Sequence, residues 1–202
     1  MADVPAGDGL AVSVTVQGRM NGRTEGVVMA QQLGPLELTE GRWVIGDPTR
    51  KEGLYVVLTP EGVEQHRRGE AAPQESVRWS QFVELGVRAG CKNWHLTRFG
   101  GLAGAFAPGA DMGRDGCSLQ GILRHPYEHW SVRYTHHERS YTGGHVIVLK
   151  ALFDQLDEAK ALERLGDPRW LGAAVAELST FTSWYAPRGT RLVEETIRGL
   201  IA

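Results

Sequence analysis

Cysteine is scarce in this sequence, and long hydrophobic runs are missing. The two cysteines, Cys91 and Cys117, fit neither a CxxC redox motif nor the ligand spacing of a zinc knuckle. We expect two reduced thiols, with a disulfide between them as the open alternative. No apolar run approaches the roughly 20 residues that a helix needs to cross a bilayer. We therefore expect no membrane span.

A strong charge of one sign is also lacking. The formal net charge is −2 in 202 residues, which argues against a protein that coats nucleic acid, because such proteins carry a large basic excess. Arginine outnumbers lysine 18 to 4, a bias that either anion recognition or a GC-rich genome explains. Residues 1–9 have neither the basic nor the apolar part of a secretory signal peptide. Together these features predict a cytoplasmic protein.

The first part of the chain does contain many short strand-like segments. The clearest is 54–58, which the turn Thr59-Pro60-Glu61-Gly62 joins to a hairpin partner. Segment 81–87 fits either a helical turn or a strand. Glycine-rich residues 99–116 are expected to form a long mobile loop. The other predicted strands are 11–17, 26–31, 36–38, 42–45, 63–67, 76–79, 117–124 and 130–137.

From about His145 the period of the hydrophobic pattern changes. Apolar residues then recur every three or four positions, which predicts helices with one buried face. Gly166 is placed to end the first helix, and Asp167-Pro168 supplies the N-cap and first residue of the second. A third helix is expected from Thr190, with Glu194 and Glu195 in its first turn. We thus predict an antiparallel β domain at 1–145 and a helical region packed on it at 146–202.

One stretch resembles a known family. Residues 54–63, together with Ser76-Val77-Arg78-Trp79 and Phe82, are similar to bacterial PH-like domains over about residues 40–87. The resemblance implies a curved antiparallel barrel or sandwich closed by a C-terminal helix, in a binding or scaffold module rather than an enzyme. The fold class is then α+β: an antiparallel β-sandwich or barrel, PH-like, followed by two or three C-terminal helices. The long loop and the additional helices depart from the family pattern.

Histidine is concentrated in one segment, because five of the seven lie at 125–145. Imidazole is a common metal ligand and a proton donor or acceptor near neutral pH. The segment is therefore the main candidate for a ligand site. The candidate ligand-binding residues are Arg124, His125, His129, His136 and His137. In the competing interpretation, His136 lies on the core face of a strand and His137, Glu138 and Arg139 form a solvated turn.

Within this segment, His125-x-x-Glu128-His129 matches the H-x-x-E-H pattern of inverted zinc peptidases. In that chemistry one face of a helix carries both histidines as zinc ligands, and the glutamate is the general base. Glu194 or Glu195 would supply the distant acidic ligand. Pro126 disfavours a helical His125, and the flanking segments have the pattern of strands. Both features argue against a zinc site. We therefore expect no cofactor, and zinc bound by His125 and His129 is the alternative.

No complete catalytic signature accompanies these residues. The sequence contains no G-x-S-x-G elbow and no phosphate-binding loop. The leading hypothesis is a non-catalytic module that binds a protein partner or a second copy of itself, with Trp184 and Tyr185 at the contact. The alternative is a metal-dependent hydrolase that uses His125, Glu128 and His129. A third hypothesis, nucleic-acid binding, would use Arg124, Arg133 and Arg139.

Overall fold

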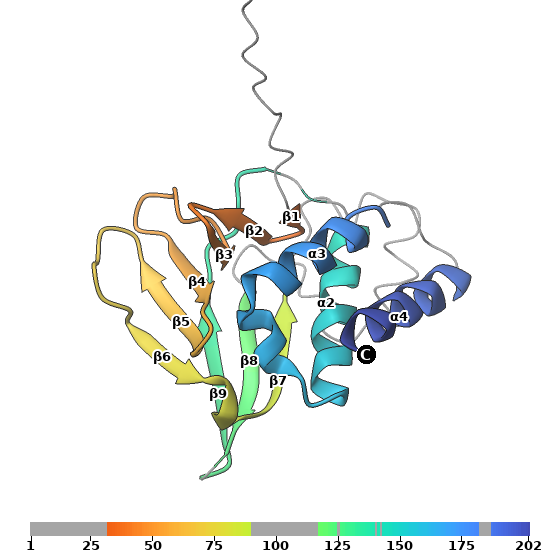
Figure 1. The fold of residues 1–202 in the computed structure, drawn as a ribbon. Coiled ribbons are helices and arrows are strands. Elements are labelled where there is room, and N and C mark those ends of the chain that lie inside the picture. The colour runs from red at the N-terminus through yellow and green to blue at the C-terminus, as the bar shows by residue number, and fades with distance from the viewer. Residues whose placement is uncertain (1–31, 90–116, 125, 140, 142, 182–186) are drawn as a thin grey trace, which may run out of the picture.

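The computed structural model describes residues 32–89, 117–124, 126–139, 141, 143–181 and 187–202 (Figure 1). They form an α+β fold with two antiparallel sheets, of six and three strands, and three α-helices at the C-terminal end. The predicted order of strands first and helices last is confirmed for this part of the chain. The strands expected at 11–17 and 26–31 and the loop at 99–116 lie outside the described residues.

The six-stranded sheet is a meander in which each strand pairs with the next along the chain. At the predicted turn after Leu58, Thr59 and Gly62 exchange two backbone hydrogen bonds. A Cβ on Gly62 would lie 2.1 Å from the carbonyl oxygen of Val77, so only glycine lets the hairpin meet the next strand here. The strands are β1 (Gln32–Leu33), β2 (Leu36–Thr39), β3 (Arg42–Ile45), β4 (Leu54–Leu58), β5 (Gly62–Arg67) and β6 (Glu75–Arg78).

A short 3-10 helix, η1 (Trp79–Gln81), leads into the three-stranded sheet. Its strands are β7 (Phe82–Arg88), β8 (Ser118–Leu123) and β9 (Glu128–Arg133). Segment 81–87, which the sequence left open, is thus mainly strand. The strand predicted at 130–137 starts and ends earlier than expected. Side chains of β9 and the first sheet connect the two sheets: Gln65 Nε2 donates to the Arg133 carbonyl at 2.9 Å, and Trp130 Nε1 donates to Glu75.

The helical region consists of α2 (Gly143–Glu158), a 3-10 helix η3 (Leu162–Gly166), α3 (Pro168–Leu178) and α4 (Pro187–Ile201). The predicted cap of α3 is confirmed, because the Asp167 carboxylate accepts hydrogen bonds from the backbone N–H groups of Arg169 and Trp170. The prediction that Gly166 ends the first helix is wrong. That helix ends at Glu158, and Gly166 instead packs under Thr59 and Trp79, where a Cβ would clash.

The start of α4 also differs from the prediction. The helix begins at Pro187, one turn before Thr190, so Glu194 and Glu195 lie beyond its first turn. Val193 and Ile197 are buried as expected, whereas Leu192 is 52% exposed. The apolar face of α4 is therefore narrower than the pattern of leucine, valine and isoleucine indicates.

Both sheets and the helices share one hydrophobic core. In Figure 1, α2 stands between β7 and α4, and both elements contact it. The buried side of α2 carries Leu149, Leu152 and Phe153 into that core. Neither strand order closes on itself, so the described strands form no closed barrel. None of the described helices has the length and apolar character needed to cross a membrane.

Candidate functional site

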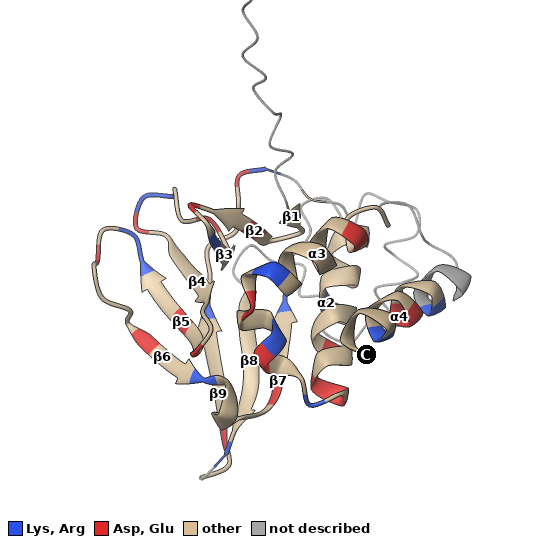
Figure 2. Cartoon of the chain, viewed as in Figure 1, with Lys and Arg blue, Asp and Glu red and all other residues tan. Residues whose placement is uncertain are grey.

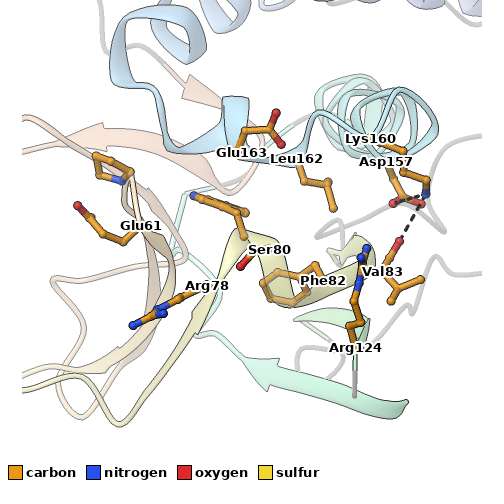
Figure 3. A pocket seen from close by; sticks show the side chains of 12 residues that line it. Glu61, Arg78, Ser80, Phe82, Val83, Arg124, Asp157, Lys160, Leu162 and Glu163 are labelled. Carbon is orange, nitrogen blue, oxygen red and sulfur yellow. Dashed lines mark hydrogen bonds and ion pairs between the residues drawn. The ribbon is translucent and has the colours of Figure 1, made fainter. Parts of the chain in front are cut away.

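A hollow of about 480 Å³ lies where the two sheets meet the end of α2 (Figure 3). Its apolar surface comes from Trp79, Phe82 and Leu162, which are each less than a tenth exposed. The indole of Trp79 is fixed by a 2.9 Å hydrogen bond from Nε1 to the Thr59 carbonyl. Phe82 packs against Trp79 at 6.3 Å and edge-on against Trp130 at 5.1 Å between ring centres. We call this feature the Phe82 hollow.

Charged side chains of both signs surround the apolar surface of the Phe82 hollow. Figure 3 shows Glu61 and Arg78 on one side of Phe82, and Asp157 and Lys160 on the other. Lys160 Nζ lies 3.4 Å from Asp157 Oδ1 and 3.5 Å from the Val83 carbonyl, which joins the end of α2 to β7. The basic residues at the hollow are Arg78, Arg124 and Lys160, and the acidic ones are Glu61, Asp157 and Glu163.

Of the predicted ligand residues that the structure describes, Arg124 lines the Phe82 hollow and the others do not. It follows β8, and its backbone N–H donates to the Gln81 carbonyl at 2.7 Å. The sequence does not predict the remaining residues of the hollow as binding residues, although Arg78, Trp79 and Phe82 belong to the stretch that resembles PH-like domains. The lining residues come from distant segments, and no local pattern marks an apolar surface that only tertiary packing assembles.

The histidines of the predicted cluster do not share one site. His129 is exposed on β9. It pairs with Ile122 of β8, which in turn pairs with Glu84 of β7. Glu84 is thus two strands away, roughly 10 Å across the sheet. His136 and His137 are buried beyond the end of β9. His125, Trp184 and Tyr185 lie outside the described residues.

The H-x-x-E-H pattern does not take the helical form that it has in zinc peptidases. Glu128 and His129 are consecutive residues of a strand, so their side chains point to opposite faces of the sheet. Among the described residues, no group of three or more His, Cys, Asp or Glu side chains is arranged to hold a metal ion. His125, which would complete the pattern, is not part of that comparison.

Glu138 is 79% exposed, as expected of a solvated turn, but His137 and Arg139 on either side of it belong to a polar cluster that is largely buried. His137 is 6% exposed, and its Nε2 lies 3.2 Å from Glu37 Oε1. Arg139 reaches the other carboxylate oxygen at 2.7 Å and donates to the Gly34 carbonyl at 3.3 Å. We call Glu37, Asp47, His137 and Arg139 the Glu37 cluster. It links the segment before α2 to β2 and to the turn after β3.

Electrostatics in the Glu37 cluster favour ionised carboxylates. Burial opposes ionisation of Glu37, but the contacts and charges of His137 and Arg139 outweigh it and lower the pKa of its carboxyl to about 2. Burial likewise opposes ionisation of Asp47, yet hydrogen bonds from Thr49 lower its pKa overall. Nearby, burial lowers the pKa of His145, assisted by the charge of Arg139. These contacts hold the fold together.

The three arginines of the nucleic-acid hypothesis do not form a patch. Arg124 and Arg133 lie at opposite ends of the β8–β9 hairpin, because Ser118 pairs with Arg133 and Leu123 with Glu128. Five residues of strand separate these ends by roughly 17 Å. Arg139 is engaged by Glu37. Figure 2 likewise shows basic and acidic positions interspersed along both sheets and the helices.

Comparison with known protein families, with curated proteins and with solved structures finds no match. The fold and the side-chain geometry of this chain therefore carry the functional argument.

Proposed function

We propose that this chain is a non-catalytic binding or scaffold module of the cytoplasm, and that the Phe82 hollow receives a peptide segment of a protein partner. One observation carries the proposal. The nearly buried side chains of Trp79, Phe82 and Leu162 form the apolar floor of a hollow at the junction of both sheets, with charges of both signs around it. That combination is typical of protein contacts, which pair an apolar centre with a polar rim.

The hollow also suggests what the partner presents. A volume of about 480 Å³ accommodates a bulky apolar side chain and its neighbours. An aromatic or leucine anchor would gain most of the binding energy by losing contact with water on this surface. Arg78 and Arg124 favour acidic residues beside the anchor, and Glu61 and Glu163 favour basic ones. The rim then sets orientation and specificity rather than affinity.

A PH-like architecture is part of the proposal. It is supported by the sequence of two antiparallel meanders followed directly by a helix, α2, that packs into their shared core. Modules of this kind present their strands and loops to partners. Trp184 and Tyr185 remain proposed contact residues for a partner or a second copy of the chain.

The proposal is tested by selecting binders from a displayed library of random peptides against the purified full chain. Affinities of the selected peptides are then measured by fluorescence anisotropy for the wild type and for Arg78→Glu and Arg124→Glu. Both arginines are exposed, so both variants should fold. We expect reversed charge at the rim to weaken binding by about tenfold for peptides with acidic flanks, the equivalent of about 1.4 kcal/mol.

The matched control is Arg42→Glu, the same change at an exposed position on β3 that does not line the hollow. It should leave affinity within about twofold, a change well below 1 kcal/mol. Equal loss in the control and the rim variants would mean that net charge alone drives binding. Failure to select any peptide whose binding depends on the rim would overturn the proposal.

The alternative proposal is a metal-dependent hydrolase that uses His125, Glu128 and His129. Elemental analysis of the purified protein distinguishes the two. Stoichiometric zinc that is lost in His125→Ala and in His129→Ala would favour the hydrolase over the binding module.

A further inference from the structure

A second hollow, of about 410 Å³, lies where β9 ends, beside the starts of β4 and β8. Its lining includes Arg50, Leu54, Cys117, Arg133, Thr135 and His136. We call it the Arg133 hollow. It shares none of its lining residues with the Phe82 hollow, so its properties are independent of the proposed protein contact.

The lining of the Arg133 hollow is positively charged. Two arginines border it, and none of the lining residues that the structure describes carries a carboxylate. The side chain of Arg133 makes no hydrogen bond or ion pair with any of the residues that the structure describes. Arg50 has a carboxylate neighbour in Glu138 at 3.3 Å, but that side chain is 79% exposed, so water screens the pair strongly. The described lining therefore carries two positive charges, and one of them, on Arg50, is paired with Glu138.

The turn between β3 and β4 holds Arg50 in place. The Asp47 carboxylate accepts hydrogen bonds from the N–H and hydroxyl of Thr49 at 2.9 and 2.6 Å. Gly53 N–H donates to the Arg50 carbonyl at 3.0 Å, and a Cβ on Gly53 would press on Arg50 at the same distance. The Arg50 guanidinium then donates to the His136 carbonyl at 3.0 Å. Little side-chain entropy remains to be lost when Arg50 binds a ligand.

His136 borders the same hollow from a fixed orientation. Its ring stacks on Tyr141 with 4.7 Å between ring centres. Nδ1 lies 2.7 Å from the carbonyl oxygen of His137. Because a carbonyl oxygen can only accept a hydrogen bond, Nδ1 carries the hydrogen. The Arg133 hollow thus has two permanent cations and an imidazole ring held in one orientation.

We propose that the Arg133 hollow binds a small molecule through a doubly charged oxyanion, such as a phosphate monoester. Two guanidinium groups balance the charge of close to −2 that a phosphate monoester carries at neutral pH. Guanidinium forks donate paired hydrogen bonds to such oxygens. The volume lies within the range of small-molecule pockets. Leu54 supplies an apolar contact for the rest of the ligand.

The proposal is tested by titrating the full chain with inorganic phosphate at constant ionic strength, followed by two-dimensional NMR of the backbone amides. We expect saturable shifts at residues 135–138, next to the hollow. Arg133→Gln should weaken phosphate binding at least about tenfold, because it removes a charge-assisted hydrogen bond. Arg42→Gln, the same change at an exposed site that lines neither hollow, should leave binding within about twofold.

Two further measurements sharpen the outcome. Arg50→Gln should also weaken phosphate binding. If loss of the hydrogen bond from Arg50 to the His136 carbonyl impairs folding, the result for Arg133→Gln alone decides the test. Titration with succinate tests whether the hollow prefers one tetrahedral dianion or two separate carboxylates. Tighter binding of succinate than of phosphate would contradict the phosphate proposal and indicate a dicarboxylate ligand. Shifts that do not saturate, or an equal loss in Arg42→Gln, would overturn the proposal whatever the fate of the Phe82 hollow.

Discussion

Glu37 is the residue whose ionisation the fold changes most clearly. Its carboxylate is 22% exposed and lies within 3.2 Å of His137 and 2.7 Å of Arg139. The pKa of Glu37 falls from 4.5 to about 2. A carboxyl whose pKa is lower in the folded chain contributes stability above the unfolded pKa, and that contribution disappears as pH falls through the folded value.

We predict that Glu37→Gln lowers the free energy of unfolding by about 1–3 kcal/mol at neutral pH, because it removes the carboxylate that pairs with Arg139 and contacts His137. The difference between variant and wild type should be constant above about pH 4.5 and should shrink as pH falls towards 2. Urea unfolding followed by tryptophan fluorescence across this range measures it. Exposed Glu40→Gln is the control. A difference that persists unchanged at low pH would contradict the assignment.

Single residues show where sequence reasoning stops. The five histidines at 125–145 stand out in the sequence. No local pattern, however, indicates that His137 contacts the carboxylate of Glu37, one hundred positions earlier in the chain. Asp167 is the opposite case. Its capping role depends only on the residues that follow, and the sequence predicts it correctly.

At the scale of elements, the β4–β5 hairpin depends on its last turn residue. Gly62 pairs with Arg78 of β6, and the Val77 carbonyl occupies the space where any side chain would begin. The constraint comes from a neighbouring strand rather than from the turn itself. The sequence therefore identifies the turn but not the reason that glycine stands there.

We predict that Gly62→Ala destabilises the fold by about 1–3 kcal/mol, because a methyl group must displace β6. Thermal unfolding followed by circular dichroism measures the loss. Gly86→Ala on β7 is the matched control, since a Cβ there meets nothing within 4 Å. It should change stability by less than about 1 kcal/mol. Equal stability of both variants would show that β6 lies further from the hairpin than the structure places it.

The β9 strand shows how an element determines the geometry of a sequence pattern. The H-x-x-E-H pattern requires helix geometry, whereas Trp130 and Val132 alternate into the core and fix Glu128–Arg133 as a strand. The alternation was visible in the sequence from Trp130 onward. The extension back to Glu128 comes from pairing with Leu123, which is a tertiary contact.

At the scale of the whole molecule, a single core extends through both sheets and the helices. Phe153 of α2 and Trp43 of β3 belong to the same buried cluster, and Trp43 Nε1 donates to the Pro168 carbonyl at the start of α3. Trp170 of α3 in turn donates to the Leu200 carbonyl of α4 at 3.0 Å. The helices therefore complete the core of the sheets.

We predict that strands and helices unfold in one cooperative transition. Tryptophan fluorescence, to which Trp170 of α3 contributes together with Trp43 of β3, Trp79 of η1 and Trp130 of β9, should give the same urea midpoint as the far-ultraviolet signal of the helices. A shared core leaves neither part with enough buried apolar surface to persist alone. Two separate midpoints would contradict this prediction and would show that 146–202 is a separate unit.

Sequence patterns alone predict the order of elements, most strand positions from Leu36 onward, the Asp167 cap and the change to helices near His145. These features depend on side-chain periodicity and turn residues, which are local properties. The tertiary structure, by contrast, places His129 apart from His136 and His137, pairs Glu37 with His137 and Arg139, and brings Arg50 and Arg133 to one hollow. Such contacts join residues roughly 80–100 positions apart. Their geometry depends on how strands and helices pack, which no local pattern specifies.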